Sequence, residues 1–165
     1  MTTASRLEHP RIKAFIKHVK SECKRTGIRV ELRNVKYLML GQGMKCSGYF
    51  DESNRKLVVA MLNPVSVEVL VHEFGHFTQW DERIPIWKEA GFAMGHIEEW
   101  LNGKTKRNIE KWMALSRDLE LDNEKRSVQL IKDFNLPIDI EKYTRSANAY
   151  VLFYNWMLTS RKWCK

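Results

Sequence analysis

The sequence predicts one α+β domain over residues 1–165, in which the strands come early and the helices come late. The alternation of apolar and polar residues that is typical of strands is confined to residues 28–61. Helical spacing and helix-capping residues dominate after Asn63. A hydrophobic content of 44% excludes a disordered chain. The longest apolar stretch, residues 147–158, is shorter than the roughly 20 residues of a membrane-spanning helix, so we expect no membrane contact.

The first predicted helix is amphipathic and basic. Its apolar positions are Ile12, Phe15, Ile16, Val19 and Cys23, and its lysines Lys13, Lys17, Lys20 and Lys24 lie on another face. Residues 1–60 carry 13 lysines and arginines against 5 acidic residues, whereas the rest of the chain carries 15 of each. Such a face is either a solvated surface or a docking surface for nucleic acid or an acidic partner. Because no aromatic residues alternate with the lysines, we expect at most weak nucleic-acid contact through this helix.

A small sheet of about three strands, antiparallel or mixed, is predicted next. Residues 28–35 alternate between apolar and polar side chains, as in a half-buried strand, and residues 37–40 extend it. A turn is expected at residues 41–43. Residues 45–50 and 56–61 flank a polar segment and therefore predict a β-hairpin.

Three long helices are predicted after the strands, because each follows an asparagine or aspartate that can cap free backbone N–H groups. These caps are Asn63, Asn108 and Asp139, and the helices end near Trp80, Phe134 and Trp163, respectively. Pro64 strengthens the first of these starts. Residues 84–103 contain one proline and three glycines, so we expect one or two short helices with loops that form a lid.

The three cysteines, Cys23, Cys46 and Cys164, form no CxxC pair and are expected to be reduced thiols. The N-terminus lacks the apolar run of roughly 7–15 residues that forms the core of a signal peptide. We therefore expect a cytoplasmic protein.

Residues 72–76, His-Glu-Phe-Gly-His, form an HExxH motif inside the predicted helix that starts at Pro64. Residues four apart on a helix differ in direction by about 40°, so His72 and His76 can bind one tetrahedral metal ion. Glu73 lies on the same side, where it can take a proton from metal-bound water as the general base of hydrolysis. Two ordinary core histidines are the alternative interpretation.

Glu120 is the predicted third ligand. On a helical wheel Ile109, Met113 and Ile131 lie within about 20° of Glu120, which places this carboxylate in the apolar stripe of its helix. Small serines flank Glu120 and leave room for another helix. A carboxylate that faces a core must be paired or bound to metal, because an isolated one is costly to bury.

Three other residues compete with Glu120. Glu82 and His96 also follow the HExxH motif and are the outside candidates for the third ligand. Glu124 shares the face of Glu120, so it is either an alternative ligand or a carboxylate that accepts the N–H of a ligating histidine. A salt bridge to lysine or arginine is the non-functional interpretation of both glutamates.

An HExxH motif followed by a glutamate on a later helix resembles the gluzincin branch of the zincin metallopeptidases. The order of elements resembles the compact minimal zincins. Residues 72–80, His-Glu-Phe-Gly-His-Phe-Thr-Gln-Trp, and residues 119–127 are similar to small metallopeptidases of phage genomes and, more distantly, to the ImmA/IrrE family. The resemblance implies that His72, His76 and Glu120 bind Zn²⁺, that Glu73 is the base, and that the gene is phage-borne in a bacterial host.

The expected function is therefore that of a zinc-dependent metallopeptidase acting on a protein or peptide substrate. The resemblance implies that substrate adds as a strand to an edge strand, for which residues 56–61 are expected. Tyr150 or Tyr154 on the last helix can donate a hydrogen bond to the oxyanion. The alternative is a non-catalytic or regulatory DNA-associated module that uses the basic helix and a structural zinc site. Glu73 favours the hydrolase, because a structural zinc site has no use for a free carboxylate.

Overall fold

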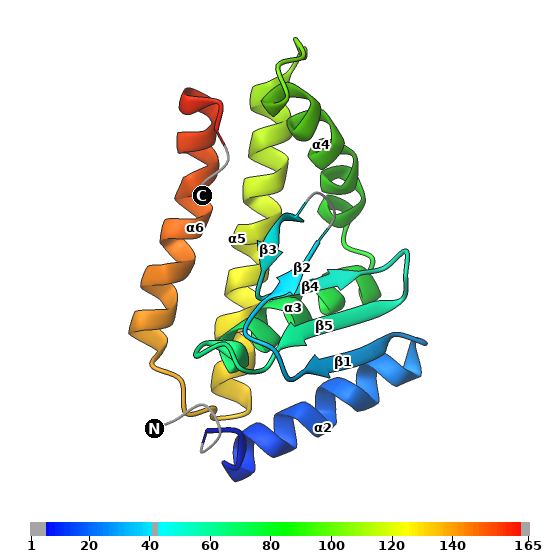
Figure 1. Ribbon diagram of the computed structural model, residues 1–165, viewed down its shortest axis with the longest axis vertical. Coiled ribbons are helices and arrows are strands. Elements are labelled where there is room, and N and C mark those ends of the chain that lie inside the picture. The colour runs from blue at the N-terminus through cyan, green and yellow to red at the C-terminus, as the bar shows by residue number, and fades with distance from the viewer. Residues whose placement is uncertain (1–5, 41–42, 163–165) are drawn as a thin grey trace.

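The computed structural model describes residues 6–40 and 43–162 and shows the predicted α+β architecture (Figure 1). The helices are α2 (Pro10–Arg25), α3 (Ser66–Asp81), α4 (Pro85–Leu101), α5 (Ile109–Asp133) and α6 (Ile140–Ser160). The strands are β1 (Arg29–Arg33), β2 (Leu38–Met39), β3 (Lys45–Cys46), β4 (Gly48–Asp51) and β5 (Lys56–Ala60). The predicted turn at residues 41–43 falls partly outside the described residues.

The main sheet is mixed and has the strand order β1-β5-β4. Strand β5 pairs in parallel with β1 and antiparallel with β4, so the predicted hairpin is confirmed for residues 48–60, whereas residues 45–46 form β3 and pair with β2. Residues 37–40 do not extend β1, because β2 pairs with β3 in a separate two-stranded sheet. The expectation that residues 56–61 form the edge strand was wrong, since β5 is central and β4 lies at the edge.

The core lies on both faces of β5, whose residues Leu57–Ala60 are fully buried. Leu57 and Val59 face the main core, which α2, α3 and the end of α5 complete. Val58 and Ala60 face the other way and pack with Leu38 of β2. Burial on both faces explains why the sequence of this strand is a continuous run of apolar residues after Lys56.

Helix α2 is amphipathic as predicted. Ile12, Phe15, Val19 and Cys23 are buried, whereas the four lysines of the opposite face are exposed. The ring of Phe15 packs edge-on against Phe74 of α3, with 5.9 Å between ring centroids. This contact joins the basic helix to the HExxH helix.

Of the three predicted helix N-caps, only Asp139 makes a capping hydrogen bond with its side chain. Asp139 caps α6, because its carboxylate accepts a hydrogen bond from the N–H of Lys142. Asn63 instead accepts from the N–H of Val65 in a turn, so α3 begins at Ser66 rather than at Pro64. Asn108 has a left-handed backbone (φ 59°) and makes no side-chain cap.

Residues 85–101 form one continuous helix, α4, so the prediction of one or two short helices with loops was wrong. Pro85 occupies its first turn, where its missing N–H costs no hydrogen bond. Gly91 and Gly95 face open space and are tolerated inside the helix. Ala93 and Ile97 are fully buried as α4 packs along α5.

The described cysteines are free thiols, as expected. Cys23 is buried and its burial raises the pKa of its thiol to about 12, while Cys46 is half-buried. Cys164 lies outside the described residues. Within the described part of the chain no helix is long and apolar enough to cross a membrane.

Helices α3 and α5 approach closely at Gly75. A Cβ atom at Gly75 would lie 2.0 Å from Oδ1 of Asn123 and 3.2 Å from Oγ of Ser127, both on α5. Asn123 and Ser127 are fully buried. The absence of a side chain at Gly75 therefore sets the distance between the two helices.

We predict that Gly75→Ala lowers the free energy of unfolding by about 1–3 kcal/mol, the usual cost of overpacking. Gly91→Ala is the matched control, because the added methyl group meets nothing within 4 Å. The better helix propensity of alanine should raise the free energy of unfolding of this variant by about 0.5–1 kcal/mol. Urea unfolding measures both changes. Equal stabilisation by the two substitutions would contradict the close approach, and Asn123→Ala should restore part of the loss in Gly75→Ala.

Candidate metal centre

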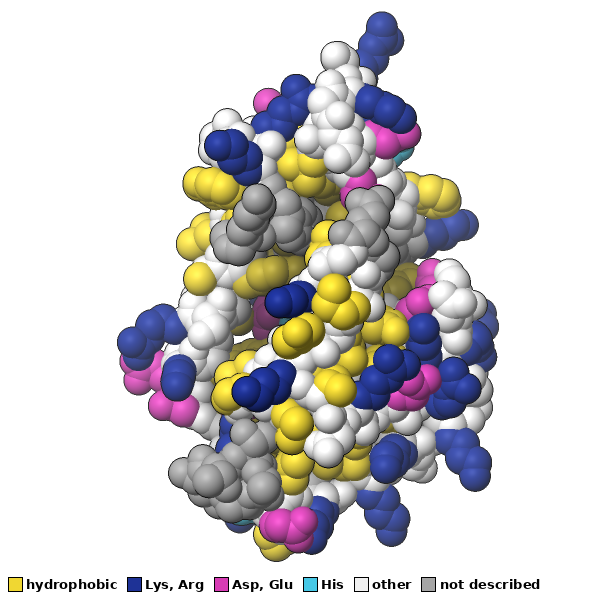
Figure 2. Space-filling model, in the orientation of Figure 1, with side chains coloured by type: hydrophobic (Ala, Val, Ile, Leu, Met, Phe, Trp, Pro, Cys, Tyr) yellow, Lys and Arg dark blue, Asp and Glu magenta, His cyan; other side chains and the backbone are white. Residues whose placement is uncertain are grey.

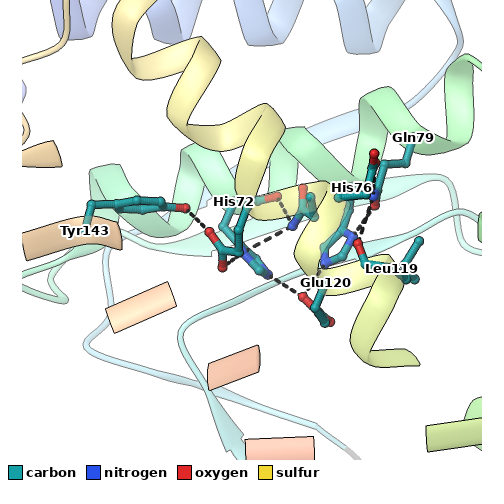
Figure 3. A network of polar contacts seen from close by, with 9 residues as sticks. His72, His76, Gln79, Leu119, Glu120 and Tyr143 are labelled. Atoms are coloured by element: carbon teal, nitrogen blue, oxygen red, sulfur yellow. Dashed lines mark hydrogen bonds and ion pairs between the residues drawn. The ribbon is translucent and has the colours of Figure 1, made fainter. Parts of the chain in front are cut away.

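The structure brings His72 and His76 of α3 together with Glu120 of α5 (Figure 3). Oε2 of Glu120 lies 3.6 Å from Nε2 of His72 and 3.5 Å from Nε2 of His76. The three side chains are 20% (His72), 12% (His76) and 10% (Glu120) exposed. Glu120 thus stands where the wheel placed it, inside the apolar stripe and facing the HExxH helix.

The donor set fits a zinc ion. Oε2 of Glu120 is buried and has no hydrogen-bond partner, which is costly unless a cation binds it. Two ligand atoms at about 2.0–2.1 Å from a tetrahedral zinc lie about 3.3 Å apart, close to the observed spacings. Two imidazole nitrogens and one carboxylate oxygen are also the ligand types of catalytic zinc sites.

Each histidine is oriented through its other ring nitrogen. Nδ1 of His72 lies 3.0 Å from Oε1 of Glu124, whose Oε2 accepts a hydrogen bond of 2.7 Å from the hydroxyl of Tyr143. Nδ1 of His76 lies 2.8 Å from Oε1 of Gln79. Both histidines therefore turn Nε2 toward Glu120, as the dashed lines of Figure 3 show for this network.

Gln79 and Tyr143 are site residues that the sequence reasoning missed. Gln79 is fully buried, and its amide nitrogen donates to the carbonyl of Leu119 (3.0 Å) and to Asp122 (2.7 Å) on α5. Its position three residues after His76 on the same helix was a signal for contact with that imidazole. Tyr143 had no such signal, because α6 packs beside α5 only in the folded chain.

The competing candidates lie elsewhere. The carboxylate of Glu82 is 2.7 Å from Nη1 of Arg126. His96 stacks on Trp112 of α5 with 4.6 Å between ring centroids. Neither residue belongs to the group of side chains close enough to share one ion.

The salt-bridge interpretation of the two glutamates finds no support. Within residues 6–40 and 43–162, no lysine or arginine forms an ion pair with Glu120 or Glu124. Burial would raise the pKa of Glu120, but the neighbouring His76 and His72 outweigh it and lower that pKa. Burial likewise opposes the charged form of His72, yet the hydrogen bond that its Nδ1–H donates to Glu124 and the nearby carboxylates raise its pKa to about 9. The site therefore holds an excess of negative charge that favours a cation.

Glu73 is buried beside the cluster, with 8% of the residue exposed. Burial raises the pKa of its carboxyl group, although His72 and His76 oppose the shift. The backbone of Phe50 in β4 lies near this carboxylate and also opposes the rise in its pKa. A Cβ at Gly48 would lie 3.0 Å from Cγ of Glu73, so β4 runs directly along this part of α3.

A cavity of about 520 Å³ reaches His72 and Glu73 from solvent; it is lined mainly by α3 and α6, and Gly48 at the start of β4 also borders it. Figure 2 shows this side of the molecule hollowed beside α6, with acidic side chains in the hollow. Tyr150 lines the cavity and is 40% exposed. Tyr154 is 2% exposed in a core cluster with Ile97, Met113 and Met157, although its ring lies 6.1 Å from that of Tyr150.

Comparisons of the chain with protein-family models, with curated proteins and with solved structures found no significant match.

We predict that Glu120→Gln weakens zinc affinity far more than Glu124→Gln. Replacing a residue that only orients a ligand typically lowers metal affinity roughly 10–100-fold, and we expect this loss for Glu124→Gln. Removing a ligand itself, as in Glu120→Gln, should lower the affinity further. Glu82→Gln and His96→Ala should leave the affinity unchanged. Competition titration with a chromophoric chelator measures all four. A larger loss in any variant other than Glu120→Gln would place the third ligand elsewhere.

Proposed function

We propose that the chain is a zinc-dependent metallopeptidase of the gluzincin type. The observation that carries the proposal is the buried carboxylate of Glu73 next to His72 and His76, at the floor of a cavity open to solvent. A purely structural metal site needs its ligands alone and gains nothing from a further buried carboxylate. A zinc ion bound by His72, His76 and Glu120 would supply Lewis acidity and lower the pKa of a water molecule in the cavity.

Glu73 would act as the general base. Glu73 and the proposed ligand His72 both line the cavity, so a water molecule beside His72 would be within reach of this carboxylate. Burial of Glu73 against β4 limits the movement of the carboxylate, which is the positioning that proton transfer requires. After accepting a proton from water, Glu73 would return it to the leaving amine.

Strand β4, rather than the expected residues 56–61, supports the binding of an extended substrate. The N–H of Ala60 donates to the carbonyl of Ser47 (2.9 Å), so alternate residues of β4 hydrogen bond to β5. The backbone groups of Gly48 and Phe50 point away from β5. In the described part of the chain no strand pairs with that edge, which runs past Glu73. A peptide can add there as a strand.

Tyr150 is the better of the two expected oxyanion donors. It lines the cavity with 6.2 Å between its ring and that of His72. Desolvation of its hydroxyl and the charge of Glu120 raise its pKa, so the hydroxyl stays protonated and able to donate. Tyr154 is enclosed by the core and does not line the cavity.

The alternative function, a DNA-associated module, would use α2. Lys17, Lys20 and Lys24 are exposed on that helix, which any amphipathic surface helix would also show. This alternative assigns no role to the buried Glu73, so we favour the peptidase.

We predict that Glu73→Gln retains one zinc per chain and loses peptide hydrolysis, because an amide cannot accept the proton. The assay is mass-spectrometric cleavage of a random peptide library by zinc-loaded protein. A chelator should abolish cleavage and added zinc should restore it. Asp118→Asn is the control, since Asp118 lies on α5 but pairs with Arg117 outside the site. Wild-type cleavage by the Glu73→Gln variant would refute the mechanism.

We predict that Tyr150→Phe lowers kcat by about 10²–10³-fold, the usual effect of removing one oxyanion donor. Tyr154→Phe should change kcat less than tenfold, because its hydroxyl lies in the core. Steady-state kinetics on one cleaved peptide compare the two variants. The reverse order would assign the donor to Tyr154, and no effect in either would remove tyrosine from the mechanism.

A further inference from the structure

A second cavity, of about 680 Å³, lies where the β4–β5 hairpin meets the end of α3 and the start of α4. Its apolar lining consists of Trp80, Ile84, Pro85, Trp87 and Phe92. The charged residues at its rim include both signs, Arg83 and Lys88 against Glu52 and Glu89. Its volume is in the range of roughly 300–1,000 Å³ that is usual for ligand sites. Because the charges of both signs favour neither a cation nor an anion, the aromatic surface is the feature that distinguishes this cavity.

This aromatic cavity adjoins the proposed metal centre. The ring of Trp87 lies 5.8 Å from that of His76 and 5.7 Å from that of Phe50. The indole N–H of Trp87 donates to Oε2 of Glu52 (2.9 Å), the residue that follows β4. The cavity therefore lies next to the Glu52 end of β4.

The wall of the cavity is partly fixed and partly open. Trp87 is held by Glu52, and Trp80 lies under the guanidinium of Arg55 at 5.2 Å. Phe92 is 66% exposed, the largest exposure among the large hydrophobic residues of the described chain. A preformed aromatic wall beside an exposed phenylalanine fits an apolar occupant.

We propose that the aromatic cavity binds a large apolar or aromatic side chain of the peptide substrate, within the two residues that precede the cleaved bond. The inference rests on the proposed peptidase function. Antiparallel pairing, the slightly more stable kind, would make the substrate run from the Glu52 end of β4 toward Gly48. Residues before the cleaved bond then lie beside Trp87, and residues after it lie toward the cavity that Tyr150 lines.

The experiment uses zinc-loaded protein and a peptide library in which the two positions before the cleaved bond are varied. Wild-type protein should favour Phe, Trp or Leu over Ala at one of these positions by about tenfold or more in kcat/KM. Phe92→Ala and Trp87→Ala should each reduce that preference at least fivefold. Leu152→Ala is the matched control, because Leu152 is a 60% exposed side chain on α6. Zinc content, measured for every variant, should not change.

A second measurement separates binding from chemistry. A peptide with Phe at the preferred position should bind the zinc-loaded Glu73→Gln protein more tightly than its Ala analogue, by calorimetry, and Phe92→Ala should remove the difference. Three outcomes would overturn the inference without contradicting the peptidase function. The protein could cleave with no side-chain preference before the cleaved bond, or with a preference only after it. The preference before the bond could also remain unchanged in both Phe92→Ala and Trp87→Ala. Zinc-loaded protein that neither binds nor cleaves any peptide would overturn both.

Discussion

The contact between α3 and α5 at Gly75 is the constraint on which the candidate site depends. Oδ1 of Asn123 occupies the space that a side chain at Gly75 would fill, and the amide of Asn123 donates to the backbone carbonyl of His72 (3.2 Å). Glu120 lies one helical turn from Asn123, so this separation sets its distance from both imidazoles. A wider gap would leave Glu120 facing a core without a partner, which is unfavourable.

Close packing of the two helices also concentrates charge. Glu73, Glu120 and Glu124 are each at least nine-tenths buried around two imidazoles. In Glu124 both carboxylate oxygens have a partner, Oε1 in His72 and Oε2 in Tyr143. Oε2 of Glu120 is left without one. Buried carboxylates repel one another, so a bound cation would stabilise the fold and supply the chemistry with the same contacts. Stability and the proposed activity would then both depend on the bound ion.

The features predicted from the sequence are those that depend on local periodicity. The wheel placed Glu120 and Glu124 on one face of α5, and HExxH spacing placed both histidines on one face of α3, because helical geometry repeats over a few residues. Features that depend on distant segments were missed. Tyr143 reaches Glu124 only through the packing of α6, and the central position of β5 depends on its parallel pairing with β1. The glycines of α4 misled the helix prediction, because their sites face solvent and cost little.

The sheet topology gives the site its direction. Since β5 is covered by β1 on one side, the antiparallel β4 is left at the edge beside α3. The Gly48 end of β4 meets the cavity lined by Tyr150, and its other end, marked by Glu52, meets Trp87. An extended peptide on this edge would thus pass Glu73 as it runs from the aromatic cavity at Trp87 to the cavity that Tyr150 lines. Two unlike cavities on either side of the proposed base would distinguish the two ends of a bound peptide, so the same pairing that builds the edge would also orient the proposed substrate.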